Sequence, residues 1–201
     1  MDDLIILGLD IHAIEVIDII NMTGRYNVLG IIDERAAGAE RLQEYMGCPV
    51  LGGPDAIARY PNAYRTPMHG WKERSDRRNW VSIISPTSFV ASSAKLGAGC
   101  IVYPNCFIGA NAILGDGVFM LSGSVVNHDC KIGDGVVITT GVALAGCVTV
   151  KAGAYLGQAC TVKQYLTIGE KCYIGMGGVV TRDVPDGVTV VGCPARPYIK
   201  A

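Results

Sequence analysis

The sequence predicts a chain in two parts: a small α/β domain at residues 1–85 and a parallel β-solenoid at residues 86–201. From Val90 to Val180, every sixth residue is aliphatic. Seven of the 26 glycines of the chain fall one residue after such an aliphatic. The residues before Val90 show the alternating strand and helix patterns of an α/β domain instead.

The six-residue repeat is the strongest signal in the sequence. A period of six matches neither the 3.6 residues of a helical turn nor the two-residue alternation of an open strand. It fits short strands joined by tight corners, with three strands to a coil, so that the repeats make about five coils. The in-phase residues are Val90, Leu96, Val102, Ile108, Leu114, Met120, Val126, Ile132, Ile138, Leu144, Val150, Leu156, Val162, Ile168, Ile174 and Val180.

Two further positions of the repeat have a constant character. Glycine is frequent one residue after the aliphatic, where the corner needs a positive φ or close packing. Four residues after the aliphatic the side chain is small, and five of the eight cysteines fall there. A thiol in that place behaves as a compact apolar group, which favours packing over metal binding or redox chemistry. These five are Cys100, Cys106, Cys130, Cys160 and Cys172.

The composition narrows the class of protein. Half of the residues are hydrophobic and 17% are charged, as in a folded globular chain. The net charge of −1 gives no reason to expect nucleic acid or an anionic membrane as a partner. No apolar run approaches the roughly 20 residues of a membrane span. The first ten residues carry no basic segment, so we expect a cytoplasmic protein with reduced thiols and no membrane span.

The N-terminal residues have the pattern of a nucleotide-binding half-unit. A buried strand at Leu4–Leu7 is followed by a helix at Ala13–Met22 and a strand at Val28–Ile32 that ends in Asp33 and Glu34. The glycine fingerprint of such units is reduced to Gly8. The remaining elements that we expect are a short helix at Pro54–Tyr60, a strand at Ala63–Met68, a helix at Lys72–Trp80 and a lead into the solenoid at Val81–Ile84.

His128 is the candidate catalytic residue. It is the one histidine of three that lies in the solenoid, two residues after the inward Val126 and therefore on an outward corner. An imidazole with a pKa near 6.5 is suited to general base catalysis, and the adjacent carboxylate of Asp129 can orient it. Taken alone, a histidine on such a corner is more often only a solvated side chain.

The whole chain resembles the hexapeptide-repeat transferases, and among them the sugar acetyltransferases of the sialic acid and bacillosamine pathways. His128 to Gly133 reproduces that family's His-Glu/Asp-Cys-x-Ile-Gly stretch, and Gly192 to Pro197 its closing segment. The resemblance implies a left-handed parallel β-helix and a homotrimer with acetyl-CoA between neighbouring subunits. It implies His128 as general base and Asp129 as the residue that raises its basicity.

The resemblance also implies binding residues. The acceptor, a sugar or nucleotide-sugar, would meet Asp10, Ile11, His12, Asp33, Glu34 and Gly70, although Ile11 and Ala13 replace family glycines. Acetyl-CoA would meet Gly146, Gln158, Met176 and Pro194. A second family histidine falls on Val137 and a family asparagine on Leu121, which puts the identity of the acceptor in doubt.

The function we expect is acetyl-CoA-dependent acetylation of the amine of a nucleotide-linked amino sugar. One alternative is O-acetylation of sialic acid or another small hydroxyl acceptor. A second, from another class, is a non-catalytic solenoid that binds a ligand or serves as a scaffold. We expect no metal, because a zinc enzyme on this solenoid would need three histidines and only His128 lies there. A dehydrogenase is disfavoured by the poor glycine fingerprint.

Overall fold

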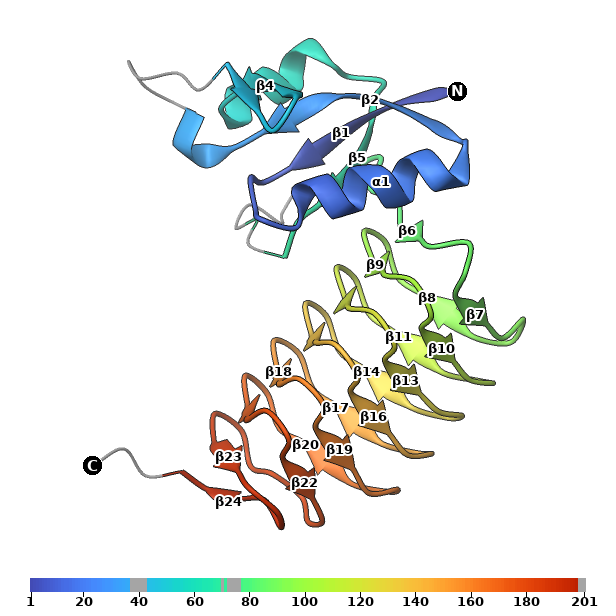
Figure 1. Cartoon of the computed structure of the whole chain (residues 1–201), viewed down its shortest axis with the longest axis vertical. Coiled ribbons are helices and arrows are strands. Elements are labelled where there is room, and N and C mark those ends of the chain that lie inside the picture. Colours follow the sequence, from blue (N-terminus) through green and yellow to red (C-terminus); the bar gives the residue numbers. More distant parts are fainter. Residues whose placement is uncertain (37–42, 70, 72–76, 199–201) are drawn as a thin grey trace.

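The computed structural model describes residues 1–36, 43–69, 71 and 77–198 of the 201-residue chain. Figure 1 shows an α/β domain stacked on one end of a long solenoid, with the N-terminus in the domain and the C-terminus at the far end of the solenoid. The predicted fold class, an α/β domain followed by a parallel β-helix, is confirmed. Its left-handed winding stays a prediction from the family resemblance.

The N-terminal domain is built on a mixed sheet whose strands lie in the order β3-β4-β2-β1-β5 within the described residues. All neighbours in this sheet are parallel except β3 and β4, which form a hairpin. Its elements are β1 (Asp2–Leu7), α1 (Ala13–Thr23), β2 (Tyr26–Ile32), the 3-10 helix η1 (Glu34–Ala36), β3 (Glu44–Tyr45), β4 (Cys48–Gly52), the 3-10 helix η2 (Pro54–Arg59) and β5 (Tyr64–Pro67).

From Leu4 to Leu7 strand β1 is buried on both faces, which explains the unbroken apolar sequence of these four residues. Leu4 and Ile6 pack in the cluster that contains α1, whereas Ile5 and Leu7 pack in the cluster on the opposite face. This division follows from the two-residue alternation of side chains along a strand. A central strand covered on both sides is typical of parallel α/β sheets.

The predicted elements of this domain correspond to observed ones. The first strand, the helix and the second strand are β1, α1 and β2, and the strand expected at Ala63–Met68 is β5. The expected helix at Pro54–Tyr60 is the 3-10 helix η2. Most of the helix expected at Lys72–Trp80 lies outside the described residues, and residues 77–80 end in a bridge between Arg65 and Trp80.

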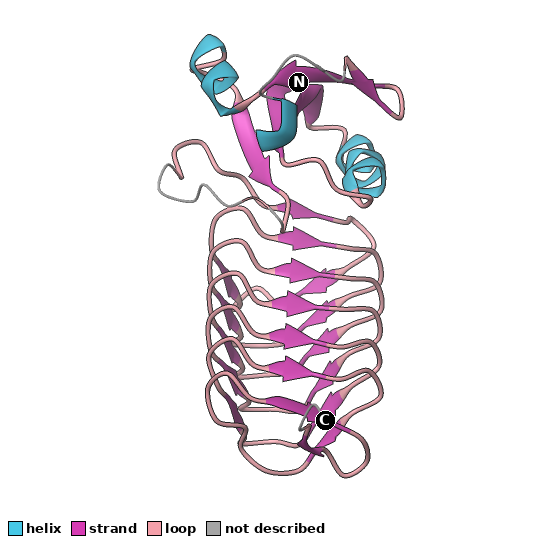
Figure 2. Cartoon of the chain, turned by 90° about the vertical axis from the view of Figure 1, so that its left-hand side faces the viewer, coloured by secondary structure: helices cyan, strands magenta, loops and turns pink. Residues whose placement is uncertain are grey.

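Except at its C-terminal end, the solenoid consists of two-residue strands that pair with strands one coil, or 18 residues, away. The strands stack into three parallel sheets (Figure 2). The longest sheet contains β6 (Ile83–Ile84), β9 (Ile101–Val102), β12 (Phe119–Met120), β15 (Val137–Ile138), β18 (Tyr155–Leu156), β21 (Tyr173–Ile174), β23 (Thr189–Val191) and the antiparallel β24 (Arg196–Pro197).

The two other sheets have the same construction. One contains β7 (Phe89–Val90), β10 (Phe107–Ile108), β13 (Val125–Val126), β16 (Ala143–Leu144), β19 (Thr161–Val162) and β22 (Val179–Val180). The other contains β8 (Lys95–Leu96), β11 (Ile113–Leu114), β14 (Lys131–Ile132), β17 (Thr149–Val150) and β20 (Thr167–Ile168).

The solenoid is longer than the five coils expected from the repeats. In the described part of the chain, seven parallel strands stack in the longest sheet, from β6 to β23. The difference arises at both ends, because β6 precedes the first in-phase residue, Val90, and β23 follows the last, Val180. The division between residues 85 and 86 stays a proposal; β6 already pairs with β9 of the solenoid just before it.

The interior of the coils is filled as the repeat predicts. One continuous cluster contains the inward aliphatics from Val102 onward together with the small residues that alternate with them. All five cysteines at the small position are buried and free, as expected from their phase. Burial raises the pKa of the Cys160 thiol to about 12, so it is uncharged in the core.

The structure of the corners separates the two roles that the sequence leaves open for glycine, which are a positive φ and close packing. The positive-φ residue is the third after the aliphatic, and it is often not glycine, as at Asn105, Asn111 and Asp129. The glycine directly after the aliphatic serves close packing instead. A Cβ on Gly133 would lie 2.5 Å from the backbone nitrogen of Ala152 in the next coil. Any side chain there would push neighbouring coils apart.

Helix α1 joins the two parts of the molecule. It lies between the N-terminal sheet and the first coils (Figure 1), and its Val16 and Ile20 share a core cluster with Ile101 and Phe119 of the solenoid. The domain is therefore anchored on the outer face of the longest sheet. Among the helices that the structure describes, none has the length and apolarity to cross a membrane.

Candidate active site

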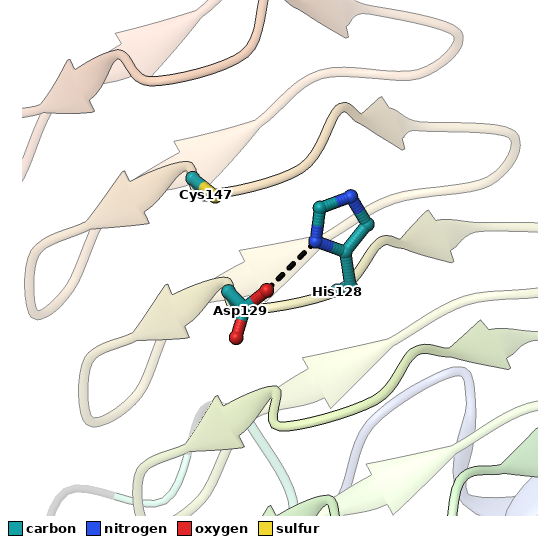
Figure 3. A group of neighbouring side chains, drawn as sticks. All are labelled: His128, Asp129 and Cys147. Atoms are coloured by element: carbon teal, nitrogen blue, oxygen red, sulfur yellow. Dashed lines mark hydrogen bonds and ion pairs between the residues drawn. The ribbon is translucent and has the colours of Figure 1, made fainter.

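His128 and Asp129 lie on the corner that follows β13 and form a hydrogen-bonded pair (Figure 3). His128 Nδ1 is 2.8 Å from Asp129 Oδ2, and both side chains are about half exposed in the single chain. Because an ionised carboxylate can only accept, Nδ1 carries the proton of this bond. The lone pair of a neutral imidazole is then on Nε2.

The local backbone explains this arrangement. Asp129 occupies the positive-φ position of its corner, with φ of 58°, a conformation that aspartate and asparagine tolerate better than most residues. Its N–H donates to the carbonyl of Ala110 in the preceding coil at 2.8 Å, and the N–H of Cys147 donates to the carbonyl of His128 at 3.0 Å. The corner is thus held by the coils on both sides.

Asn111 completes the set of hydrogen bonds around the carboxylate. Its Nδ2 donates to Asp129 Oδ1 at 3.1 Å, so the two oxygens of Asp129 have different partners. The hydrogen bond from His128, followed by that from Asn111, lowers the pKa of Asp129 below its usual value. Asp129 is consequently a carboxylate at neutral pH, as its orienting role requires.

Gly146 lies directly against the imidazole, one coil further along the same corner. A Cβ on Gly146 would be 2.5 Å from His128 Nε2 and 2.6 Å from Cε1. This distance is far inside van der Waals contact, so only glycine allows the ring to occupy its place. The family resemblance predicts Gly146 at acetyl-CoA, and the geometry adds that its lack of a side chain makes room for the imidazole of His128.

Cys147 is the third potential ligand near this pair. Within the described residues, His128, Asp129 and Cys147 each offer one ligand atom, and these atoms all lie within 4.8 Å of one another. Of these side chains, His128 and Asp129 already bond each other, with Nδ1 2.8 Å from Oδ2.

The four residues expected at acetyl-CoA do not share one corner. Gly146 follows β16, on the corner of His128. Gln158 and Met176 follow β18 and β21 of the longest sheet, and Pro194 lies in the segment after β23, so these three belong to a different corner column. Gln158, Met176 and Pro194 are exposed. A single chain therefore separates Gly146 from the other three.

A second candidate site is a cavity of about 260 Å³ in the N-terminal domain, at the carboxyl ends of β1 and β2. In open α/β sheets this end is where ligands bind. Of the predicted acceptor residues, Asp10, Asp33 and Glu34 line it. The other lining residues are Gly8, Leu9, Arg35, Met68 and Trp71.

The carboxylate of Asp33 links the segments that line this cavity through hydrogen bonds. Its Oδ2 accepts from the N–H of Leu9 at 2.6 Å, and its Oδ1 accepts from Nε of Arg35 at 2.8 Å. Burial opposes ionisation of Asp33, but the hydrogen bonds from Arg35 and the backbone outweigh it and lower its pKa. Glu34, which lines the cavity beside it, is the acid better placed to meet a ligand hydroxyl.

The remaining predicted acceptor residues lie elsewhere or are undescribed. Ile11 is 77% exposed, and Gly70 lies outside the described residues. His12 contacts the rings of Tyr103 and Phe119, and its Nδ1 is 3.0 Å from Glu15 Oε2. It therefore packs at the junction with the solenoid and is not among the residues that line the cavity.

Sequence reasoning missed two groups of residues here. Arg35, Met68 and Trp71 reach the cavity from separate segments, and no local spacing connects them. Asn111 could have been found, because it precedes Asp129 by 18 residues, or one full coil. In a solenoid of three six-residue repeats per coil, residues 18 apart are stacked neighbours.

The comparisons with known proteins agree with this organisation. Residues 3–66 match the family described as the PglD N-terminal domain. The whole chain superposes on a variant of perosamine N-acetyltransferase from Caulobacter crescentus, crystallised with CoA and GDP-perosamine. That match has a TM-score of 0.84 and 30% identity and covers 100% of this chain and 98% of the other. The chain belongs to the PglD-type hexapeptide-repeat nucleotide-sugar N-acetyltransferases.

Two further relatives extend the comparison. The acetyltransferase domain of PglB from Neisseria gonorrhoeae, in complex with acetyl coenzyme A, has a TM-score of 0.83 and 26% identity over 98% of both chains. A Schizosaccharomyces pombe protein named as an acetyltransferase is 38% identical over 53 residues, which make up 26% of either chain. The predicted family is thus confirmed, and with it an acetyltransferase that uses acetyl-CoA.

Proposed function

We propose that this acetyltransferase transfers the acetyl group of acetyl-CoA to the amine of a nucleotide-linked amino sugar, with His128 as the general base. The observation that carries the proposal is the outward His128, tied through Nδ1 to Asp129 at 2.8 Å. This bond fixes the tautomer and leaves Nε2 to take a proton.

The reaction follows from this geometry. The neutral amine attacks the thioester carbonyl carbon and forms a C–N bond, while Nε2 of His128 takes a proton from the nitrogen. The tetrahedral intermediate collapses and breaks the C–S bond. The departing CoA thiolate then takes the proton from the imidazolium, which restores the neutral base. A positioned base of this kind contributes on the order of 10²- to 10⁴-fold in rate.

The acceptor would bind through the cavity of the N-terminal domain. Its volume of about 260 Å³ is below the range of about 300–1,000 Å³ typical of sites that enclose a whole ligand. It would therefore enclose only part of a nucleotide-sugar and leave the amino sugar outside. Glu34 and Arg35 at this cavity offer an acceptor for hydroxyl groups and a positive charge for phosphate.

A homotrimer would bring together the residues that are predicted to bind acetyl-CoA and that lie apart in one chain. Gly146 lies at the corner of His128, whereas Gln158, Met176 and Pro194 lie in another corner column of the same chain. One acetyl-CoA that touches both sets must therefore lie between two subunits. Closed threefold symmetry would make three equivalent sites of this kind.

The relatives support the choice of substrates. The Caulobacter enzyme was crystallised with CoA and GDP-perosamine, an amino sugar on a nucleoside diphosphate, and the Neisseria domain with acetyl coenzyme A. By their similarity we assign the same chemical classes to this chain. Which amino sugar and which nucleotide it takes depends on the N-terminal domain, where it departs most from the family pattern.

The test is a panel of acceptors assayed with acetyl-CoA by release of free thiol. The panel contains UDP-, GDP- and dTDP-linked amino sugars, the matching sugars with a hydroxyl in place of the amine, the free amino sugars and sialic acid. We expect turnover only with one or more nucleotide-linked amines. Turnover of sialic acid or a hydroxyl sugar would replace the proposal by O-acetylation. Acetyl-CoA binding without thiol release from any acceptor would favour a non-catalytic solenoid.

A further inference from the structure

The carboxylate that orients His128 is itself held by a residue of the preceding coil. Asn111 Nδ2 donates to Asp129 Oδ1 at 3.1 Å, while Asp129 Oδ2 accepts from His128 at 2.8 Å. We propose that Asn111 is a positioning residue that fixes the carboxylate of Asp129, and through it the imidazole of His128. This inference rests on the proposed role of His128 as the base.

The coil geometry makes the contact specific. Asn111 and Asp129 occupy the same corner position in successive coils, and both have φ of 58°. Equivalent side chains one coil apart therefore point in the same direction, separated by the strand spacing of about 4.8 Å. The N–H of Asn111 in turn donates to Oγ of Ser93, one coil earlier, at 3.0 Å. Ser93, Asn111 and Asp129 thus form a polar ladder along one corner.

Asp129 needs such a partner because it is not buried. Its side chain is 48% exposed, and the His128 bond alone would leave its second oxygen to water and the carboxylate free to rotate. A misplacement of about 1 Å in a catalytic group can reduce a rate by on the order of 100-fold. Asn111 restricts that rotation without adding a charge.

The neutrality of Asn111 matters for the proton affinity of His128. Two titratable groups that lie near the imidazole are Asp129 on its own corner and Cys147 from the next coil. An uncharged amide supports the carboxylate and adds no charge of its own. A second carboxylate at position 111 would favour the imidazolium form of His128.

The experiment compares three variants. Asn111→Gly removes the amide at a position where positive φ makes glycine free of strain. Asn105→Gly is the matched control, because Asn105 has φ of 61°, is exposed and also anchors its N–H on a hydroxyl of the preceding coil. Asn111→Asp keeps the shape, removes the N–H donor to Asp129 and adds a negative charge. The readouts are kcat, KM for acetyl-CoA, the acid limb of the pH–rate profile, and the NMR titration of the imidazole, assigned with His128→Ala.

We expect Asn111→Gly to lower kcat about tenfold, by loss of positioning, with KM for acetyl-CoA unchanged. Asn111→Asp should shift both the acid limb and the His128 titration to higher pH, and Asn105→Gly should match the wild type. A kcat and titration that are the same in all four proteins would overturn the proposal, as would equal losses in Asn111→Gly and Asn105→Gly. The titration requires no acceptor, so it tests Asn111 even if the proposed substrate is wrong.

Discussion

The role of a residue is determined by its position in the repeat in the solenoid, but by tertiary contacts in the N-terminal domain. In the solenoid, the phase of a residue within the six-residue repeat determines whether it points into the core, packs against the next coil or lies on an outer corner. In the N-terminal domain, the cavity is formed by Gly8–Asp10, Asp33–Arg35, Met68 and Trp71, which meet only through the tertiary fold.

This difference suits the two tasks of the enzyme. The proposed chemistry is the same for every acceptor, and its base lies on a corner that backbone hydrogen bonds hold from both neighbouring coils. The proposed acceptor site lies in the N-terminal domain, where residues can change without breaking a repeat. Functional sites on rigid scaffolds with variable connecting segments follow the same logic.

Removal of the base should give the largest effect. We expect His128→Ala to lower turnover by about 100-fold or more, the contribution of a positioned general base, while the proposed trimer persists because the side chain lies outside the core. Free-thiol release measures turnover, and size-exclusion chromatography measures assembly.

A position-matched control is available for this variant. Ser92 lies on the same corner as His128 two coils earlier and is exposed, so Ser92→Ala should keep wild-type activity. Activity of His128→Ala equal to that of Ser92→Ala would remove the base from the mechanism. The solenoid could then no longer be described as the region that carries the catalytic base.

What the sequence could predict follows the same division. The repeat is a local signal, so the phase of the core can be read from spacing, and the pair His128–Asp129 is predicted by the resemblance of the surrounding motif to the family's. The partners of Asp33 cannot be predicted in either way, because Leu9 and Arg35 meet it only after β1 and β2 pair. The contacts of His12, which the family resemblance predicts at the acceptor, with Tyr103 and Phe119 at the solenoid junction also arise only in the tertiary fold.

The claim that position in the repeat determines burial can be tested by substituting two isoleucines. Ile138 is fully buried in the solenoid core, whereas Ile113 lies on an outer face and is 45% exposed. We expect Ile138→Ala to lower the free energy of unfolding by about 2–5 kcal/mol, as for other buried isoleucines. Ile113→Ala should cost less than about 1 kcal/mol, since far less area leaves water.

Urea titration followed by circular dichroism measures both values. Equal losses for the two variants would mean that phase does not determine burial, and the contrast drawn between the solenoid and the N-terminal domain would fail. The measurement should be made at one protein concentration, because assembly adds to the apparent stability.

The close contact between Gly146 and the imidazole of His128 can be tested by adding one methyl group. Gly146→Ala would place a Cβ 2.5 Å from His128 Nε2, so the ring must move, and we expect kcat to fall about 10- to 100-fold. The backbone of Gly146 is not among the positive-φ positions, so alanine fits the chain itself.

A double-mutant cycle identifies the cause of this loss. With His128→Ala in place the ring is absent, and the added methyl should have almost no further effect on turnover. If Gly146→Ala lowers the activity of His128→Ala by the same factor as that of the wild type, the methyl acts on acetyl-CoA alone. That outcome would leave Gly146 as a cofactor residue only.

The smallest expected effect concerns Asp33 in the N-terminal domain. Its folded-state pKa is lowered, so its ionisation stabilises the fold above the unfolded-state pKa of about 3.9, and that stability is lost as the pH falls through the folded-state value. We expect Asp33→Asn to lower the free energy of unfolding by about 1–2 kcal/mol at pH 7, the scale of hydrogen bonds to a charged group. The difference from wild type should be constant above about pH 5 and shrink below about pH 4.

Urea titrations from pH 3.5 to pH 8, in roughly half-unit steps, measure this difference, with Asp55→Asn at an exposed position as the control for net charge. A difference that does not change with pH would mean that Asp33 acts by shape and not by charge, and the cavity would then owe its form to packing alone.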